Sequence, residues 1–151
     1  MKSIIKPENF KLYYSIYHPI SLMTSRQCLH QQVIGCDKSS IDEECIQECR
    51  KSSSIRNLNK VPLFIKKSKG NYHCIYNNNN FLNTDIATDL PDVFSSFFID
   101  LRDIKTETKI GVDKSRIIAL FEQLLNGDND SKNELKQMIH PSTNTQYLKG
   151  I

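Results

Sequence analysis

The chain has 151 residues, of which 38% are hydrophobic and 25% charged, and its mean hydropathy is −0.46. This is the length of one ordinary domain with a real core. Because no apolar run approaches the ~20 residues that a membrane span needs, we expect no membrane partner. The expected location is the cytoplasm. The net charge of +3 does not by itself indicate a nucleic-acid binder.

Aromatic and β-branched residues dominate residues 4–21, and Pro7 and Pro19 interrupt this stretch. The composition predicts a strand rather than a helix. Residues 20–24 are then expected to form a short buried strand that leads to the first cysteine.

Four of the five cysteines crowd into residues 23–50. They are Cys28, Cys36, Cys45 and Cys49. The last two have C-x3-C spacing, so a helix there would direct both sulfurs toward one ion. Gly35 and residues 38–40 indicate a loop before it. A thiol-bearing loop followed by a helical turn with two more thiols is a common scaffold for a metal or an iron–sulfur cluster.

Three interpretations of these cysteines remain open: a soft-metal or iron–sulfur site, a structural zinc site, and disulfides or inert thiols. The gaps of seven, eight and three residues differ from the short paired spacers of most zinc sites. Disulfides need an oxidising compartment, and residues 1–10 lack the apolar run of a signal peptide. Acids such as Asp42 and Glu44 are expected to raise the pKa of the thiols, a cost that a bound cation removes. His18 and His30 are each either a ligand, a proton carrier or simply hydrogen-bonded.

A basic stretch follows, because residues 50–72 hold seven basic side chains and no acid. It is either a solvated surface or a strip that contacts phosphates. The residues that we assign to nucleic-acid binding are Arg50, Arg56, Lys60, Lys66, Lys67 and Lys69.

Residues 61–76 are predicted to form a β-hairpin, with Gly70 in its turn because glycine adopts positive φ freely. Residues 52–59, which precede it, read as a polar loop. The return strand carries Cys74, which is either another thiol ligand or an inward-facing structural cysteine.

Residues 77–80 are four asparagines that predict an exposed loop, and residues 81–92 are expected to be irregular. Residues 94–101 predict the strongest strand of the chain, with Phe97, Ile99 and Leu101 on one face. The charged run at residues 100–103 ends this strand, where it serves either chemistry or a simple salt bridge.

Asp113 is predicted to cap a helix that runs to about Asn126 and stops at Gly127. The expected apolar face of this helix is Ile117, Ile118, Phe121, Leu124 and Leu125.

A capping-box pattern from Ser131 to Glu134 predicts a second, short helix that His140 and Pro141 end. Its expected buried side is Leu135, Met138 and Ile139. Residues 142–151 are expected to be polar and extended.

Several stretches, in order, resemble the C-terminal part of the peptidase U32 family, the collagenase-like proteins. They are PISLMTSRQC, CIQEC, the hairpin ending CIYN, FFIDLRD followed by a helix, and TNTQYLKGI. The resemblance covers residues 17–151 and implies the C-terminal portion of a protein that carries a TIM-type barrel. The expected fold is mixed α/β in a single domain, residues 1–151, with a cysteine-rich segment at 17–50, the hairpin at 61–76, and a strand plus two helices within 94–151.

Some members of this family are described as peptidases, and others act in oxygen-independent hydroxylation of RNA bases or of a quinone precursor. The hydroxylation proteins hold an iron–sulfur cluster through four cysteines. The resemblance therefore implies a 4Fe-4S cluster on Cys28, Cys45 and Cys49, with Cys36 as the favoured fourth ligand and Cys74 as the alternate. It also implies RNA as a partner.

A complete (β/α)8 barrel needs about 250 residues, so a second chain is expected to supply the rest of it. Whether this chain is itself an enzyme stays open. One alternative is a peptidase, although no convincing nucleophile–base pair is present. Another alternative is a non-catalytic partner chain that zinc stabilises.

Overall fold

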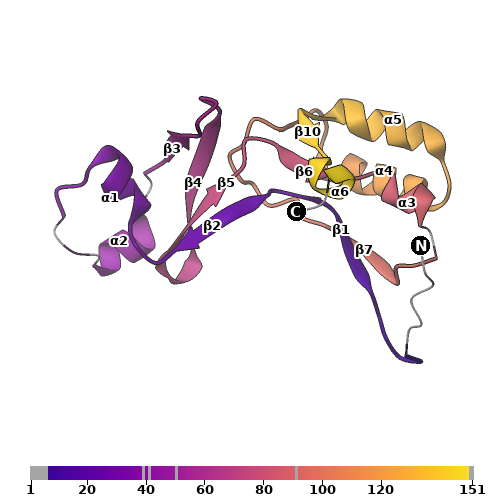
Figure 1. Ribbon diagram of the computed structural model, residues 1–151, viewed down its shortest axis with the longest axis horizontal. Coiled ribbons are helices and arrows are strands. Elements are labelled where there is room, and N and C mark those ends of the chain that lie inside the picture. The colour runs from indigo at the N-terminus through magenta and orange to yellow at the C-terminus, as the bar shows by residue number, and fades with distance from the viewer. Residues whose placement is uncertain (1–6, 39, 41, 50, 91, 150–151) are drawn as a thin grey trace.

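The computed structural model describes residues 7–38, 40, 42–49, 51–90 and 92–149. Two four-stranded sheets lie toward opposite ends of an elongated molecule, each with its own helices (Figure 1). The mixed α/β class is therefore confirmed. The assignment of residues 1–151 to a single domain stays a prediction.

Sheet A has the strand order β10–β6–β1–β7. Its strand β1 (Tyr13–His18) runs antiparallel to β6 (Asn80–Leu82) and parallel to β7 (Ser96–Ile99). The short β10 (Ser142–Thr143) adds to β6 in parallel. The C-terminal end of the described chain thus returns to the sheet that β1 begins.

Two helices, α4 (Lys114–Leu125) and α5 (Asn129–Met138), cover one face of sheet A. Asp113 caps α4 by accepting a hydrogen bond from the backbone N–H of Arg116 at 2.9 Å, and Gly127 follows its end at φ +93°. The main core lies between helices and sheet, because burial of apolar area is the dominant favourable term in folding. Its buried members are Ile16, Tyr17, Leu82, Ile86, Ile117, Leu120, Phe121, Leu124, Leu135 and Ile139.

Sheet B is antiparallel throughout, in the order β2–β5–β4–β3. Its strands are β2 (Ser21–Ser25), β3 (Ser53–Arg56), β4 (Pro62–Ser68) and β5 (Tyr72–Tyr76). The turn η1 (Lys69–Asn71) closes the β4–β5 hairpin. Two short helices, α1 (Leu29–Ile34) and α2 (Glu43–Glu48), lie between β2 and β3 in the chain.

A small second core joins α1 to sheet B. Leu29 packs there on Ile65 and Ile75, and all three side chains are buried. One face of β5 therefore serves this core, while the alternate residues of the strand point to the other face.

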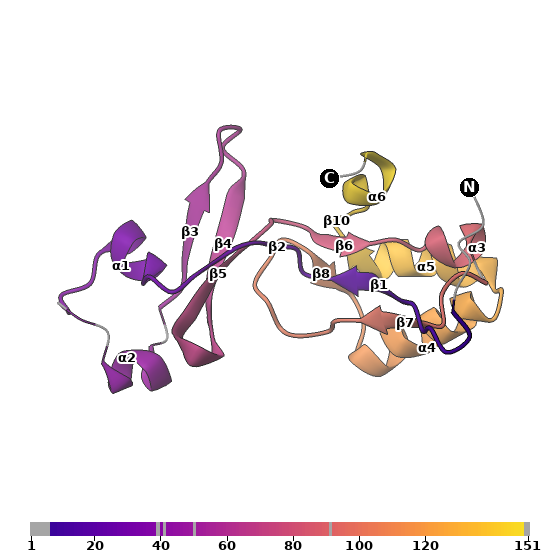
Figure 2. The ribbon, with the colours of Figure 1, turned by 60° about the horizontal axis from the view of Figure 1, so that its bottom comes forward.

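Two chain crossings connect the sheets, as Figure 2 shows: β1 leads into β2, and β5 leads into β6. The crossings are bonded to each other, because the N–H of Asn77 donates to the carbonyl of Ile20 at 2.9 Å. The remaining elements are α3 (Ile86–Asp89), the pair β8 (Lys109–Ile110) and β9 (Ile139–His140), and α6 (Thr145–Lys149).

Several sequence predictions are confirmed. The hairpin at residues 61–76 forms, and Gly70 takes φ +76° in its turn. A strand occupies residues 13–18, and the helix after Asp113 ends at Leu125. These features depend on local chemistry, namely strand composition, a capping carboxylate and glycine in turns.

Other predictions about single elements are wrong. The strand at residues 21–25 is mostly exposed, because it lies at the edge of sheet B. Residues 53–56 form a strand rather than a loop, since β4 offers an edge for pairing. The tail contains α6, and α5 begins after the cap Asp128 rather than at Ser131, whose hydroxyl instead donates to that cap at 2.6 Å.

The asparagine run is also not an exposed loop. Asn80 is only 5% exposed and begins β6, where a side-chain hydrogen bond replaces the solvent that a polar residue normally needs. On α4, Ile118 and Leu125 are 41% and 44% exposed, and Leu120 takes the buried position instead.

The described residues form two open sheets and a two-stranded pair, with no closed barrel among them. The barrel expectation is therefore not met by this part of the chain. In the same residues no helix is long and apolar enough to cross a bilayer.

The different burial of two leucines on α4 gives a test of the core. Leu120 is fully buried, whereas Leu125 on the same helix is 44% exposed. We expect Leu120→Ala to lower the free energy of unfolding by about 2–5 kcal/mol, because it leaves a cavity. Leu125→Ala, the matched control, should cost less than about 1 kcal/mol. Urea denaturation followed by circular dichroism measures both, and equal losses would contradict this packing.

Candidate functional site

The cysteine segment, residues 28–49, distributes its four thiols over the ends of two short helices. Cys28 is the N-cap of α1, and its Sγ accepts from the N–H of Gln31 at 3.4 Å. Cys36 follows the C-cap Gly35, Cys45 lies in α2, and Cys49 is the C-cap of α2 in an extended conformation. Each of the four is half-buried and free.

Cys49 therefore leaves the helix that carries Cys45. The C-x3-C pair was expected to share one helical face. Because Cys49 has an extended backbone at the C-cap, its thiol does not have the i, i+4 placement relative to Cys45 that a continuous helix would give. The helix α1, which sequence reasoning read as loop, occupies the residues between Cys28 and Cys36.

Lysines rather than acids dominate the surroundings of Cys36. The backbone N–H of Lys38 and the side chain of Lys51 hydrogen-bond to its sulfur and lower the pKa of the thiol. The acids are occupied elsewhere: Asp42 caps α2 by accepting from the N–H of Cys45 at 2.7 Å, and Lys38 pairs with Asp42 and Glu44. The hydrogen bonds from Lys38 and Lys51 outweigh Asp37, which raises the pKa of the Cys36 thiol as expected, so the net shift is opposite to the expected one.

The thiols supply the donor chemistry of a soft-metal site without its geometry. Among the residues that the structure describes, no three His, Cys, Asp or Glu side chains come together as a metal-binding group. Neither a four-cysteine iron–sulfur cluster nor a four-ligand zinc ion fits the thiols as they are placed, because each needs its ligands around one point.

Cys74 belongs to a different face. Its Sγ lies 3.5 Å from the hydroxyl of Thr24 and 3.6 Å from that of Ser68. The neighbours His73 and Ile75 alternate with it along β5 and point to the side that α1 covers. This placement favours the interpretation of Cys74 as a structural cysteine.

Histidines near the cysteines are hydrogen-bonded or buried. His18 Nδ1 lies 2.8 Å from the hydroxyl of Ser15, and His30 Nδ1 lies 2.7 Å from that of Ser53. His73 meets His30 edge to face, with 5.1 Å between the ring centroids, and both are 1% exposed. Burial, and then nearby charges, lower the pKa of both rings. Sequence reasoning missed His73, which only the β5 register brings against α1.

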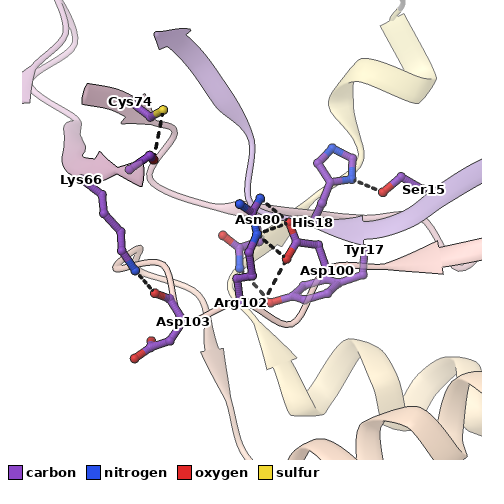
Figure 3. A network of polar contacts seen from close by, with 10 residues as sticks. Ser15, Tyr17, His18, Lys66, Cys74, Asn80, Asp100, Arg102 and Asp103 are labelled. Carbon is purple, nitrogen blue, oxygen red and sulfur yellow. Dashed lines mark hydrogen bonds and ion pairs between the residues drawn. The ribbon is translucent and has the colours of Figure 1, made fainter. Parts of the chain in front are cut away.

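A basic cleft of about 320 Å³ begins beside Cys49. Its basic side chains are Lys51, Lys66, Lys67 and Lys105. Phe64 lines the same cleft, and the Lys105 ammonium lies 6.0 Å from the centroid of its ring. Lys66 donates to the backbone carbonyl of Asp103, which brings β4 against the segment after β7 (Figure 3).

The predicted basic residues divide into two groups. Lys66 and Lys67 line the cleft, whereas Arg56 and Lys60 are exposed at the β3–β4 turn and do not line it. Arg50 and the Lys69 side chain lie outside the described residues. Lys51 and Lys105 were not assigned to binding, and Lys105 could be found only from the contact between β4 and residues 103–105.

The charged run after β7 forms a salt bridge. The Arg102 Nε lies 2.9 Å and 3.0 Å from the two Asp100 oxygens, and Nη2 lies 2.6 Å from one of them (Figure 3). Hydrogen bonds from the Arg102 side chain hold the pKa of Asp100 below its ordinary value of 3.8. This geometry supports the salt-bridge interpretation, and Asp100 touches no nucleophile among the described contacts.

Comparisons of the chain with protein families, with curated proteins and with solved structures found no match.

The Asp100–Arg102 pair predicts a pH dependence of stability. Because the folded-state pKa of Asp100 lies below 3.8, the pair stabilises the protein above that pH and loses its effect as the pH falls through the folded-state pKa. We expect Asp100→Asn to cost about 1 kcal/mol at pH 7, since Arg102 is largely solvated.

Denaturation midpoints between pH 7 and pH 2.5 measure this effect. The gap between the native protein and Asp100→Asn should close in acid. The control is Asp103→Asn, at an exposed neighbour. Its denaturation midpoint should stay close to that of the native protein at every pH. A gap that persists at pH 2.5 would show that Asp100 acts through something other than its charge.

Proposed function

We propose that this chain binds single-stranded RNA in the basic cleft, as the C-terminal part of a U32-like protein. The observation that carries the proposal is the grouping of four lysines around one half-buried phenylalanine. Lysines neutralise phosphates, and an aromatic ring provides a stacking surface for an unpaired base. The side chains come from three separate segments, so their grouping is a property of the fold and not of one charged run.

The charge balance of the cleft favours a polyanion. Four ammonium groups face a single carboxylate, that of Asp103, among the residues that line it. The backbone carbonyl of Asp103 already accepts a hydrogen bond from Lys66, and Lys51 donates to the carbonyl of Gly35 at 3.4 Å. Neither of these contacts neutralises the charge of its lysine. Phosphate contacts give affinity without sequence specificity, so the base identity would be read elsewhere.

The reaction that this binding serves is an extension of the U32 resemblance. Oxygen-independent hydroxylation of an RNA base fits a module that holds RNA. The peptidase alternative has Ser53 at the cleft with His30 Nδ1 2.7 Å from its hydroxyl, but His30 Nε2 has no hydrogen-bond partner among the described residues that would orient the ring for catalysis. A second chain would supply the TIM-type barrel and its catalytic groups.

A second proposal concerns the cysteine segment: it binds a 4Fe-4S cluster, or alternatively zinc, after rearranging. Four free thiols lie in the segment between β2 and β3, and none of them belongs to the two hydrophobic cores. Metal binding often orders its own ligand loop. Free thiols are also typical of a reducing compartment, which supports a cytoplasmic location. Cys49 borders the RNA cleft, so a bound cluster would lie beside the substrate.

RNA binding is tested with Lys66→Gln/Lys67→Gln. We expect the double variant to reduce the slope of log affinity against log salt concentration by about 1.4, because two phosphate contacts of a single strand are lost. Phe64→Leu should weaken binding by about 1–3 kcal/mol through lost stacking. Fluorescence anisotropy with a labelled ten-nucleotide RNA at several salt concentrations measures both.

The matched control is Arg56→Gln/Lys60→Gln, which removes the same charge from the β3–β4 turn outside the cleft. It should retain most of the slope. Equal effects of the two double variants would mean that the charge of sheet B, and not the cleft, attracts RNA. No binding at low salt would refute the proposal.

The metal proposal is tested by iron, sulfide and zinc content with an absorption spectrum, on protein purified without oxygen. We expect about four irons and four sulfides per chain, lost in Cys45→Ser and in Cys49→Ser. Cys74→Ser is the control and should keep its colour, because that thiol lies on the other face of sheet B. One zinc and no colour would support the structural alternative, and protein free of both metals would refute each.

A further inference from the structure

A second cavity, of about 480 Å³, lies between sheet A and the segment that follows β7. β1 and β6 contribute Tyr17 and Asn80 to it, and residues 101–110 and the start of α4 supply the other walls. Figure 3 shows Tyr17, Asn80 and Arg102 approaching one another from these elements. The volume is within the range of small-ligand sites, about 300–1,000 Å³.

The cavity is rich in cations that have no counter-ion. Lys105, Lys109 and Lys114 line it, and none of them forms a salt bridge within the described chain. Arg102 is also present but is neutralised by Asp100, and Asp103 is the one acid among the lining residues. Three ammonium groups around one space favour an anion with several oxygens.

Buried polar atoms of the cavity lining lack partners. Asn80 and Thr106 are each 5% exposed, and neither Asn80 Oδ1 nor Thr106 Oγ1 has a hydrogen-bond partner within the described structure. A buried polar atom left without a partner costs about 1–3 kcal/mol. Both residues line the cavity, and a ligand or water that reaches these shielded atoms would complete their bonding.

The Tyr17 hydroxyl adds a directed donor. It accepts a hydrogen bond from Asn80 Nδ2 at 2.7 Å. The other atom of that amide, Asn80 Oδ1, is the one without a partner among the described residues. The proton of Tyr17 meets no acceptor among the contacts of the described residues. The lining therefore combines three lysines with the hydroxyls of Tyr17 and Thr106, which suit phosphate oxygens. Its third hydroxyl, that of Thr108, already donates to the carbonyl of Pro141, and the amide carbonyl of Asn80 needs an N–H or O–H donor.

We propose that this cavity binds a nucleotide, with its phosphate on Lys109 and Lys114 and with a hydroxyl or amino group of its nucleoside on Asn80 Oδ1. A lone phosphate has the charge but neither the size nor the spread of donors for the whole lining. Lys105 borders both this cavity and the basic cleft, so the nucleotide is either free or one unit of an RNA strand. The site stands on its own residues and does not depend on the RNA proposal.

Isothermal titration calorimetry of the full chain with AMP, adenosine and inorganic phosphate tests the proposal. We expect AMP to bind at least about tenfold more tightly than adenosine or phosphate, because it uses both halves of the site. Lys109→Gln/Lys114→Gln should weaken AMP binding about tenfold. Lys11→Gln/Lys149→Gln, with the same charge loss at exposed lysines outside the cavity lining, should leave AMP affinity within about twofold.

Thr106→Val separates binding from folding. Its hydroxyl has no protein partner, so the variant should melt no lower than the native protein while AMP binding weakens about threefold or more. AMP that binds no more tightly than phosphate would refute the nucleotide, and unchanged affinity in Lys109→Gln/Lys114→Gln would refute the location.

The source of the nucleotide is decided by competition with a five-nucleotide single-stranded RNA. If that RNA displaces AMP, and loses affinity in Lys109→Gln/Lys114→Gln, the cavity holds one unit of a strand. If AMP binds and the RNA does not displace it, the ligand is a free nucleotide. Lys67→Gln, at a lysine that lines the cleft and not the cavity, should leave AMP affinity unchanged, so failure of the cleft and failure of the cavity can be told apart.

Discussion

A hydrogen-bonded network around the buried Asn80 holds the centre of this molecule together. Its amide donates to the Tyr17 hydroxyl at 2.7 Å, and its backbone N–H donates to Thr108 Oγ1 at 2.8 Å. Thr108 in turn donates to the carbonyl of Pro141. Three segments that are distant in sequence are tied to β6 in this way, although Asn80 Oδ1 is left without a hydrogen-bond partner among the described residues. The lysines of residues 105–109 owe their position to it.

Electrostatics then join the two halves of the chain. The segment after β7 contacts β4 through Lys66 and forms the wall that both cavities share. Lys105 and Asp103 line both the cleft and the cavity, so the basic surface continues from sheet B to the first residue of α4. The net charge of the chain is nevertheless only +3. A mild total charge can therefore accompany a locally strong positive potential, because several lysines line these two spaces and Asp103 is the one acid among the described residues that does so.

The cysteine segment is the least constrained part of this arrangement. Its helices have six residues each, and Leu29 is the buried apolar residue that ties α1 to sheet B. Isolated helices of this length are marginal in water, so the thiols sit on a scaffold whose shape a ligand can change. The same segment ends at Cys49, beside the cleft, which places any chemistry of the thiols next to the basic surface.

The sequence by itself determined the features that depend on neighbours along the chain. The β4–β5 hairpin, the Asp113 cap and the stop at Gly127 were all predicted, because turn chemistry and capping act over a few residues. A salt bridge within residues 100–103 was one of two alternatives. Only the tertiary structure decided the rest. It buried Asn80, turned Cys74 away from α1, brought His73 against His30, and joined Lys105 to Lys66 and Phe64. Each of these depends on strand register and long-range pairing, which the hydrophobic periodicity and the composition of the sequence do not specify.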